Sequence, residues 1–156
     1  MNPSVALRPM TQAEYAELVD RLVTGYAASH VEAGQWAADE ARQKAVAELD
    51  QLLPDGVATK DMALFTAEAE GRPVGRLWLA FGRPRPDEGW IYYIEVEPAE
   101  RGRGYGRAVL SAAEATCAAR GLATLGLNVF GPNTAARSLY ESAGYETTSL
   151  QMRKGL

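Results

Sequence analysis

The glycine-rich stretch RGRGYG, residues 101–106, combines features that suit anion binding. It follows the aromatic run WIYYIEVEP and precedes the Ala-rich run RAVLSAAEATCAAR, so we expect it at a strand-to-helix turn. The start of a helix leaves backbone N–H groups unpaired and carries partial positive charge. Glycines adopt positive φ and admit a ligand closely, so successive N–H groups can converge on it. Together with Arg101, Arg103 and Arg107, this pattern indicates a phosphate or pyrophosphate site.

The motif is short and also fits a tight turn whose arginines only keep the surface soluble. Two other phosphate-binding motifs do not fit it. A Rossmann fingerprint would need glycine at position 107, which is an arginine, and an early βαβ unit. A Walker A loop, G-x-x-x-x-G-K-[ST], has no match in the chain.

The elements that must position this turn follow from the hydrophobic period and from Gly and Pro breakers. TQAE at residues 11–14 predicts a capping box, Gly71 a tight hairpin turn, and Asn133 an N-cap. In chain order we predict a strand over 4–9, a helix from 11 to the break at Gly34, a helix over 37–53, strands over 62–70, 73–81 and 90–98, a helix over 107–120, a strand over 123–130, a helix over 133–143 and a strand over 145–154. The order is β-α-α-β-β-β-α-β-α-β, which predicts one mixed α/β domain over residues 1–156.

Composition excludes several classes of protein. The 156 residues are 47% hydrophobic and 23% charged, which is typical of a globular domain. A net charge of −4 argues against a nucleic-acid partner, because such domains usually carry excess Lys and Arg. Cys117 is the only cysteine, lies on the apolar stripe of its helix and is predicted to belong to the core. No signal peptide or apolar run of about 18 residues is present, so we expect a soluble, cytoplasmic protein without membrane contact.

Two motifs in the second half resemble the GNAT superfamily of acyl-CoA-dependent N-acyltransferases. RGRGYG after VEP fits [RQ]-x-x-G-x-[GA], and LNVFGPNTAARSLYESAGYE follows at the expected distance; together they span about residues 91–146. The stretch YAASHVEAGQW … LLPDG is similar to bacterial GNAT proteins of unassigned substrate. The resemblance implies a GNAT fold, with a mixed, mostly antiparallel sheet, helices on both faces and a bulged, splayed central strand pair.

The resemblance also implies where coenzyme A binds. In the family the glycine turn holds the pyrophosphate, a role that backbone N–H groups from Arg103 to Gly106 would take. The pantetheine arm pairs with the strand before the turn, where one N–H would face the thioester oxygen as an oxyanion donor. The implied acetyl-CoA-binding residues are Ile94, Val96, Arg101, Gly102, Arg103, Gly104, Tyr105, Gly106, Arg107 and Asn133.

Three residues are candidates for catalysis. Tyr140 lies seven residues after Asn133, on the same side of a helix, and the resemblance implies that it protonates the departing thiolate; a packing tyrosine is the alternative. Tyr92 stands where many relatives place a Glu or His that handles the proton of the amine, so the base stays open. Glu95 is a candidate if the bulge turns it inward, and water acting on the amine is another.

The sequence therefore predicts transfer of an acetyl group from acetyl-CoA to a primary amine, by direct attack in a ternary complex. The alternative is a non-catalytic acyl-CoA-binding module, a sensor or a structural protein. We expect a small-molecule or peptide amine as partner, no metal, and a chain that allows a homodimer. Trp90 and Tyr92 are expected to line the acceptor side, together with Tyr26 and Trp36.

Overall fold

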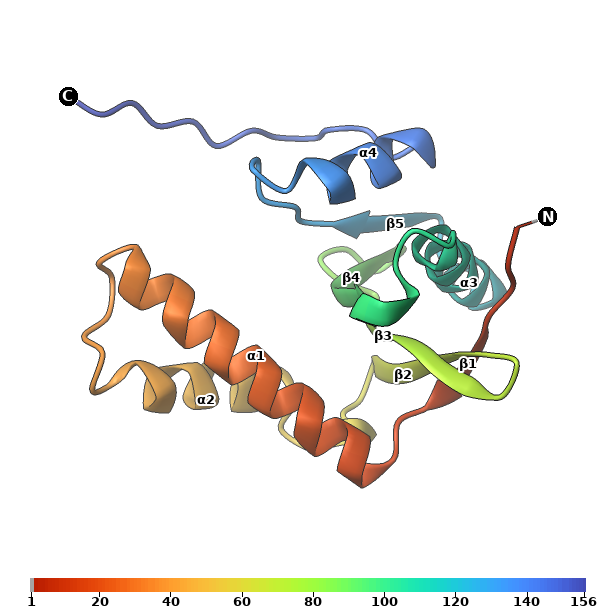
Figure 1. The fold of residues 1–156 in the computed structure, drawn as a ribbon, viewed down its shortest axis with the longest axis horizontal. Helices are drawn as coiled ribbons and strands as arrows, with labels where there is room; N and C mark the ends of the chain where they lie inside the picture. The colour runs from red at the N-terminus through yellow and green to blue at the C-terminus, as the bar shows by residue number, and fades with distance from the viewer. Residues whose placement is uncertain (1) are drawn as a thin grey trace.

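The computed structural model describes residues 2–156 and has a mixed sheet with helices on both faces (Figure 1). Its elements are β1 (Ala6–Pro9), α1 (Gln12–Glu32), α2 (Ala41–Leu52), η1 (Gly56–Ala58), β2 (Met62–Ala69), β3 (Arg72–Phe81), β4 (Glu88–Val96), η2 (Pro98–Glu100), α3 (Tyr105–Ala119), β5 (Thr124–Leu127) and α4 (Thr134–Ser142). The strand order in the sheet is β1-β2-β3-β4-β5. The pairs β1–β2, β2–β3 and β3–β4 are antiparallel, and the pair β4–β5 is parallel. The predicted fold class is confirmed.

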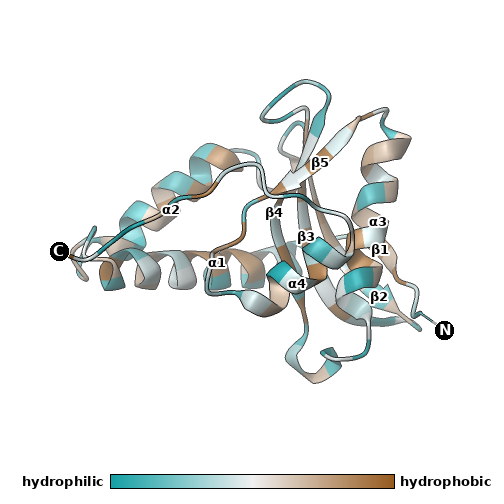
Figure 2. Cartoon of the chain, turned by 90° about the horizontal axis from the view of Figure 1, so that it is seen from above, coloured by the Kyte–Doolittle hydropathy of each residue, from teal (hydrophilic) through white to brown (hydrophobic). Residues whose placement is uncertain are grey.

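Alternating residues of the central strands send their side chains to opposite faces of the sheet, and each face has its own core. On one face Leu77, Leu79 and Ile91 pack with buried residues of α3. On the other, Trp78 and Ala80 pack with Leu18 of α1. Figure 2 shows α3 against one side of the sheet and the α1–α2 pair projecting from the other.

The two strands that matter most for function, β4 and β5, diverge. Tyr92 has no partner on β3, because Trp78 pairs with Tyr93 and Leu79 with Ile91, so β4 carries a bulge there. The pairing of β4 with β5 ends at Ile91, just before this bulge. A bulge bends its strand and increases the local twist, which explains why the strands separate beyond it. The predicted bulge and splay are confirmed.

Elements set by local chemistry begin where the sequence predicts. Thr11 and Glu14 form the reciprocal capping box at the start of α1, and the side chain of Asn133 caps α4 by accepting from the N–H of Ala136. Helix α2 starts at Ala41, four residues later than expected. Strand β5 ends at Leu127, three residues early, because its partner β4 has already turned away.

The last predicted strand, over 145–154, is wrong for this chain taken alone. No strand follows α4, and residues 146–156 are all exposed. A strand exists only when a neighbouring strand accepts its hydrogen bonds, and this segment runs away from the sheet (Figure 1).

Candidate active site

The glycine turn before α3 has the backbone geometry that the sequence predicts. Gly102 and Gly104 adopt φ of 76° and 84°, values that side chains other than glycine disfavour. Gly104 is the N-cap of α3, and no side chain caps the helix there. The helix start is therefore left to its backbone groups.

These backbone groups are free to bind a ligand. Among the hydrogen bonds within residues 2–156, none is donated by the backbone N–H groups of residues 102–107. Unpaired donors at the positive end of a helix are the kind of backbone arrangement that can bind phosphate groups. The positive φ of Gly102 and Gly104 and the unpaired N–H groups are compatible with the predicted anion-binding turn, and its role as a binding site stays a prediction.

Three arginines surround the turn, each with a nearby partner. The Nε of Arg101 donates to the carbonyl of Val96 at 3.2 Å, Arg103 donates to Glu100 at 3.1 Å, and Arg107 donates to the hydroxyl of Ser142 on α4. The side chains of Arg101 and Arg103 are exposed, so they can turn toward an anion without leaving a buried charge unpaired, whereas Arg107 is half-buried.

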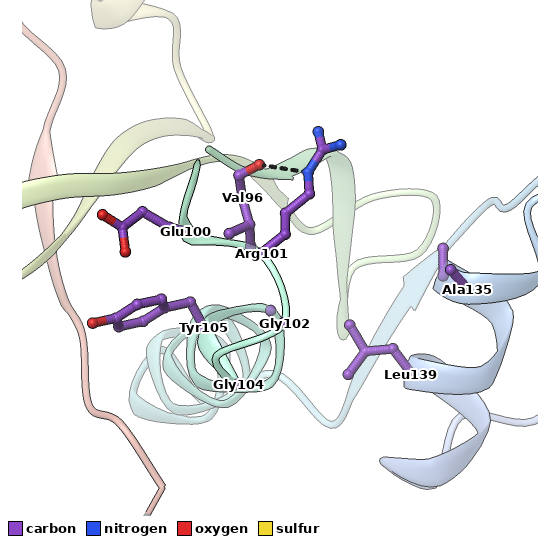
Figure 3. A pocket seen from close by; sticks show the side chains of 10 residues that line it. Val96, Glu100, Arg101, Gly102, Gly104, Tyr105, Ala135 and Leu139 are labelled. Carbon is purple, nitrogen blue, oxygen red and sulfur yellow. Dashed lines mark hydrogen bonds between the residues drawn. The ribbon is translucent and has the colours of Figure 1, made fainter. Parts of the chain in front are cut away.

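A cavity of about 290 Å³ opens between this turn and α4. It is lined by Val96, Glu100, Arg101, Gly102, Gly104, Tyr105, Gly106, Ala135, Ala136 and Leu139. Figure 3 shows Leu139 and Ala135 on α4 facing the turn from one side, and Tyr105 pointing away from α4. Tyr105 is buried in the core, so of this predicted site residue only the backbone is available to a ligand.

Gly106 keeps this cavity open. A Cβ at position 106 would lie 3.2 Å from a methyl of Leu139 and 3.9 Å from one of Val96, both of which line the cavity. Any side chain here would narrow the passage between β4 and α4.

The free edge of β4 beyond the bulge borders the same space. The N–H of Glu97 donates to the carbonyl of Val74 on β3, and backbone groups alternate in direction along an antiparallel strand. Ile94 and Val96 therefore direct their N–H and C=O groups away from β3, toward the side that β5 has left. This edge can accept an extended ligand as an extra strand, once the Arg101 guanidinium shares or leaves the Val96 carbonyl.

The bulge places Tyr92 on the face of the sheet that packs against α1. Its ring stacks on Trp78 with centroids 4.7 Å apart. Tyr26 and Trp36 instead form a separate cluster with His30 near the end of α1. The structure thus does not bring Tyr26 and Trp36 to Tyr92, contrary to the expectation of one shared aromatic lining.

Glu95 lies on this face within a cluster of arginines that sequence reasoning missed. Its Oε2 accepts from the Tyr93 hydroxyl at 2.9 Å, from Arg76 at 3.1 Å and from Arg21 at 3.3 Å. Its Oε1 has only long contacts, 3.4 Å to Arg21 and 4.0 Å to Arg101. Burial, together with the hydrogen bond to Glu95, raises the pKa of Tyr93 to about 12. The cluster fixes the carboxylate and leaves Oε1 the freer oxygen.

One of these partners could have been found from the sequence. Arg76 faces Glu95 across the β3–β4 pair, and opposite charges at directly paired positions attract. Arg21 lies on α1, far away in the sequence, and no local signal places it there.

The two α4 residues are arranged differently from each other. Asn133 uses its side-chain oxygen to cap the helix, which leaves its amide nitrogen for other contacts. Tyr140 is buried, and burial raises its pKa. Its hydroxyl has no hydrogen-bond partner within residues 2–156 and is not completely enclosed by protein atoms.

The described residues were searched for metal-binding clusters and for membrane-spanning helices. No group of three or more His, Cys, Asp or Glu side chains in residues 2–156 is placed to hold a metal ion. None of the helices in that range combines the length and apolar character that crossing a bilayer requires.

Comparison with known proteins agrees with this geometry. The model of the acetyltransferase (GNAT) family matches residues 25–145. The chain is 30% identical to the N-acetyltransferase YycN of Bacillus subtilis, over 98% of this chain and 99% of that one. The crystal structure of YycN matches it with a TM-score of 0.87 over the same shares.

More distant relatives share part of the sequence or the fold. The mycothiol acetyltransferase of Thermobispora bispora is 36% identical over 76% of this chain and 38% of its own length. The structure of AAC(6')-Iy in complex with a bisubstrate analog, CoA-S-monomethyl-acetylneamine, has a TM-score of 0.62 at 18% identity, covering 97% of this chain and 99% of that one. With a family model that covers most of its length and a relative matched end to end, the chain belongs to the GNAT family and is an acyl-CoA-dependent N-acyltransferase.

Proposed function

We propose that this enzyme transfers an acetyl group from acetyl-CoA to a primary amine, by direct attack within a ternary complex. The observation that carries the proposal is the set of free backbone N–H groups at residues 102–107, beside a cavity that leads to the free edge of β4. Charge-assisted hydrogen bonds contribute about 1.5–3 kcal/mol each, so several such donors suffice to hold a diphosphate. The arginines around the turn add to this attraction.

The pantetheine arm would continue from the turn along β4. Ile94 and Val96 offer the backbone groups that pair with its amides, and Asn133 offers its side-chain amide from α4. An N–H of this edge would donate to the thioester oxygen, which stabilises the negative charge that develops there during attack. The thioester carbon would then lie near the bulge, with the acceptor on the side of Tyr92.

The chemistry then needs two proton transfers. The amine nitrogen attacks the thioester carbon, the C–S bond breaks, and the sulfur takes a proton from the hydroxyl of Tyr140, which recovers one from solvent. The proton that the amine loses passes to the Oε1 of Glu95, directly or through water. Arg76 and Arg21 hold this carboxylate in place, and Tyr92 lines the acceptor side next to it.

The test uses acetyl-CoA, a panel of primary amines and detection of the released thiol. We expect the Tyr140→Phe variant to lose about 10²- to 10⁴-fold in kcat, because a positioned general acid contributes that much, while coenzyme A binding is kept. Tyr15→Phe is the matched control: Tyr15 is a partly buried tyrosine of the other core cluster, and burial raises its pKa as it does for Tyr140. Equal kcat in both variants would remove Tyr140 from the chemistry.

The same assay separates catalysis from the non-catalytic alternative. Saturable thermal stabilisation by acetyl-CoA, without thiol release for any amine, would indicate a binding module. Glu95→Gln tests the proposed base; Arg76 would keep an ionic partner in this variant, because it also contacts Glu97 at 2.6 Å. An unchanged kcat in Glu95→Gln would assign the proton to water.

A further inference from the structure

Arg21 of α1 lies on the face of the sheet that the proposed acceptor approaches, and most of its hydrogen-bonding capacity is unused. Its Nη1 is 3.3 Å from Oε2 and 3.4 Å from Oε1 of Glu95, whereas charge-assisted hydrogen bonds are usually about 2.7–2.9 Å long. Within residues 2–156 its Nε and Nη2 make no hydrogen bond, and its side chain is 45% exposed. The edge of the guanidinium formed by Nε and Nη2 is therefore available to a ligand.

The neighbouring arginine of the same cluster is already compensated. Arg76 is 12% exposed and lies 3.1 Å from Glu95 and 2.6 Å from Glu97. Glu17, one helical turn before Arg21, has its ionic contact with Arg76 as well, at 4.0 Å. In the described residues Arg76 thus has three carboxylates around it, and Arg21 has only Glu95.

The surface beside Arg21 has room for a small molecule. Gly25 lies four residues further along on the same side of α1, and a Cβ added there would meet nothing within 4 Å. Tyr92 on the same face of the sheet is 36% exposed, so part of its ring is open to an apolar contact. A small acceptor can therefore contact Glu95 and Arg21 without displacing a side chain of α1.

Glu95 and Arg21 together match the two charged groups of an α-amino acid, which carries its amine and its carboxylate on the same carbon atom. The pair presents the complementary groups side by side, with Oε1 of Glu95 and Nη1 of Arg21 3.4 Å apart. The amine would donate to Oε1 of Glu95, and the carboxylate would accept from Nε and Nη2 of Arg21. Such a forked pair of hydrogen bonds is the geometry in which arginine recognises carboxylates.

We propose that the acceptor is a free α-amino acid and that Arg21 binds its carboxylate. The inference rests on the proposed function, in which Glu95 takes the proton of the amine and Tyr140 gives one to the sulfur. The amine nitrogen forms the new C–N bond, the thioester C–S bond breaks, and the products are an N-acetylamino acid and coenzyme A. The terminal amine of a peptide has an amide in place of this carboxylate, and the side-chain amine of a lysine lies far from one, so neither would use Arg21.

The test measures thiol release from acetyl-CoA with the L-amino acids that carry a primary α-amine, each compared with its α-carboxamide. The carboxamide keeps the amine and the side chain but lacks the negative charge. We expect kcat/KM for the preferred amino acid to exceed that for its carboxamide by about 10- to 100-fold, the range that one charge-assisted hydrogen bond contributes. Equal values for the two acceptors would overturn the proposal.

The variant Arg21→Met separates binding of the carboxylate from positioning of Glu95. We expect KM for the amino acid to rise about 10- to 100-fold, with a much smaller change in KM for the carboxamide. Arg21→Lys keeps the charge without the fork and should restore part of the loss. A residue that only positioned Glu95 would lower kcat equally for both acceptors, and this result would contradict the proposal.

Arg42→Met is the matched control. It removes another exposed arginine of the α1–α2 pair, which lies 2.8 Å from Asp20, and it should leave both KM values unchanged. A preference for the carboxylate that persists in Arg21→Met would overturn the assignment of this residue.

Failure of this inference and failure of the proposed function give different results. Thiol release with amines of several kinds, but without a preference for the α-carboxylate, would overturn the inference alone. No thiol release with any amine, the amino acids included, would overturn the proposed function and the inference with it.

Discussion

Gly106 offers the sharpest test of the coenzyme A path, because its replacement by alanine should separate binding from stability. It is the second residue of α3, and because it has no side chain, the space beside Leu139 and Val96 stays open. Alanine favours a helix over glycine by about 1 kcal/mol in a helix interior, and less near its start. The added methyl would meet Leu139 at 3.2 Å, so the leucine must yield by a few tenths of an ångström. These effects oppose each other, and we expect the free energy of unfolding to change by less than about 1 kcal/mol.

Binding should respond much more. The methyl would project into the space that the proposed ligand occupies between β4 and α4, where it displaces ligand contacts. We expect the Kd for coenzyme A, measured by calorimetry, to rise at least about tenfold, which corresponds to roughly 1.4 kcal/mol. Alanine keeps the backbone N–H of residue 106, so the weaker binding of coenzyme A would come from the added methyl group and not from a lost hydrogen-bond donor.

A matched control is available on α1. Gly25 lies inside that helix, and a methyl added there would have nothing within 4 Å, so Gly25→Ala should raise the melting temperature by roughly 2–4 °C and leave coenzyme A binding unchanged. Gly102→Ala should lower the free energy of unfolding, because a φ of 76° costs a non-glycine residue about 1–2 kcal/mol.

A Kd for coenzyme A in Gly106→Ala equal to that of the wild type would refute the path through this cavity.

Three further outcomes follow from the buried groups. Arg76→Met should lower the free energy of unfolding by about 1–3 kcal/mol in urea titrations, because Glu95, 18% exposed, and Glu97 lose their shared donor; an unchanged midpoint would contradict this. The pKa of Tyr93, raised from 10 to about 12, means that between these pH values the unfolded chain loses a proton that the folded chain keeps. The contribution of Tyr93 to stability should therefore be constant below pH 10 and be lost as pH rises toward 12, and Tyr93→Phe should make the alkaline fall in stability less steep. Burial raises the pKa of Cys117, so the native protein should react with a thiol reagent only on unfolding, and rapid labelling without denaturant would show that this side chain is accessible.

Features whose chemistry lies within a few residues could be predicted from the amino-acid sequence. The capping box of Thr11 and Glu14, the N-cap of Asn133 and the positive φ of Gly102 and Gly104 all depend on side chains or backbone freedom at the position itself. Local hydrogen bonds and steric limits decide such features in any fold, which is why the glycine turn and the helix after it could be predicted.

Contacts between side chains of different elements depend on how the chain packs and could not be predicted from the sequence. Arg21 and Glu95 are 74 residues apart, and their contact depends on how α1 packs over β4. Tyr92 reaches Trp78 because a bulge shifts the register between β3 and β4 by one residue. The last strand failed for the same reason: residues 145–154 have the pattern of a strand, but pattern does not supply the neighbouring edge that a strand requires. Register and partner are properties of the assembled core, so a local pattern cannot determine them.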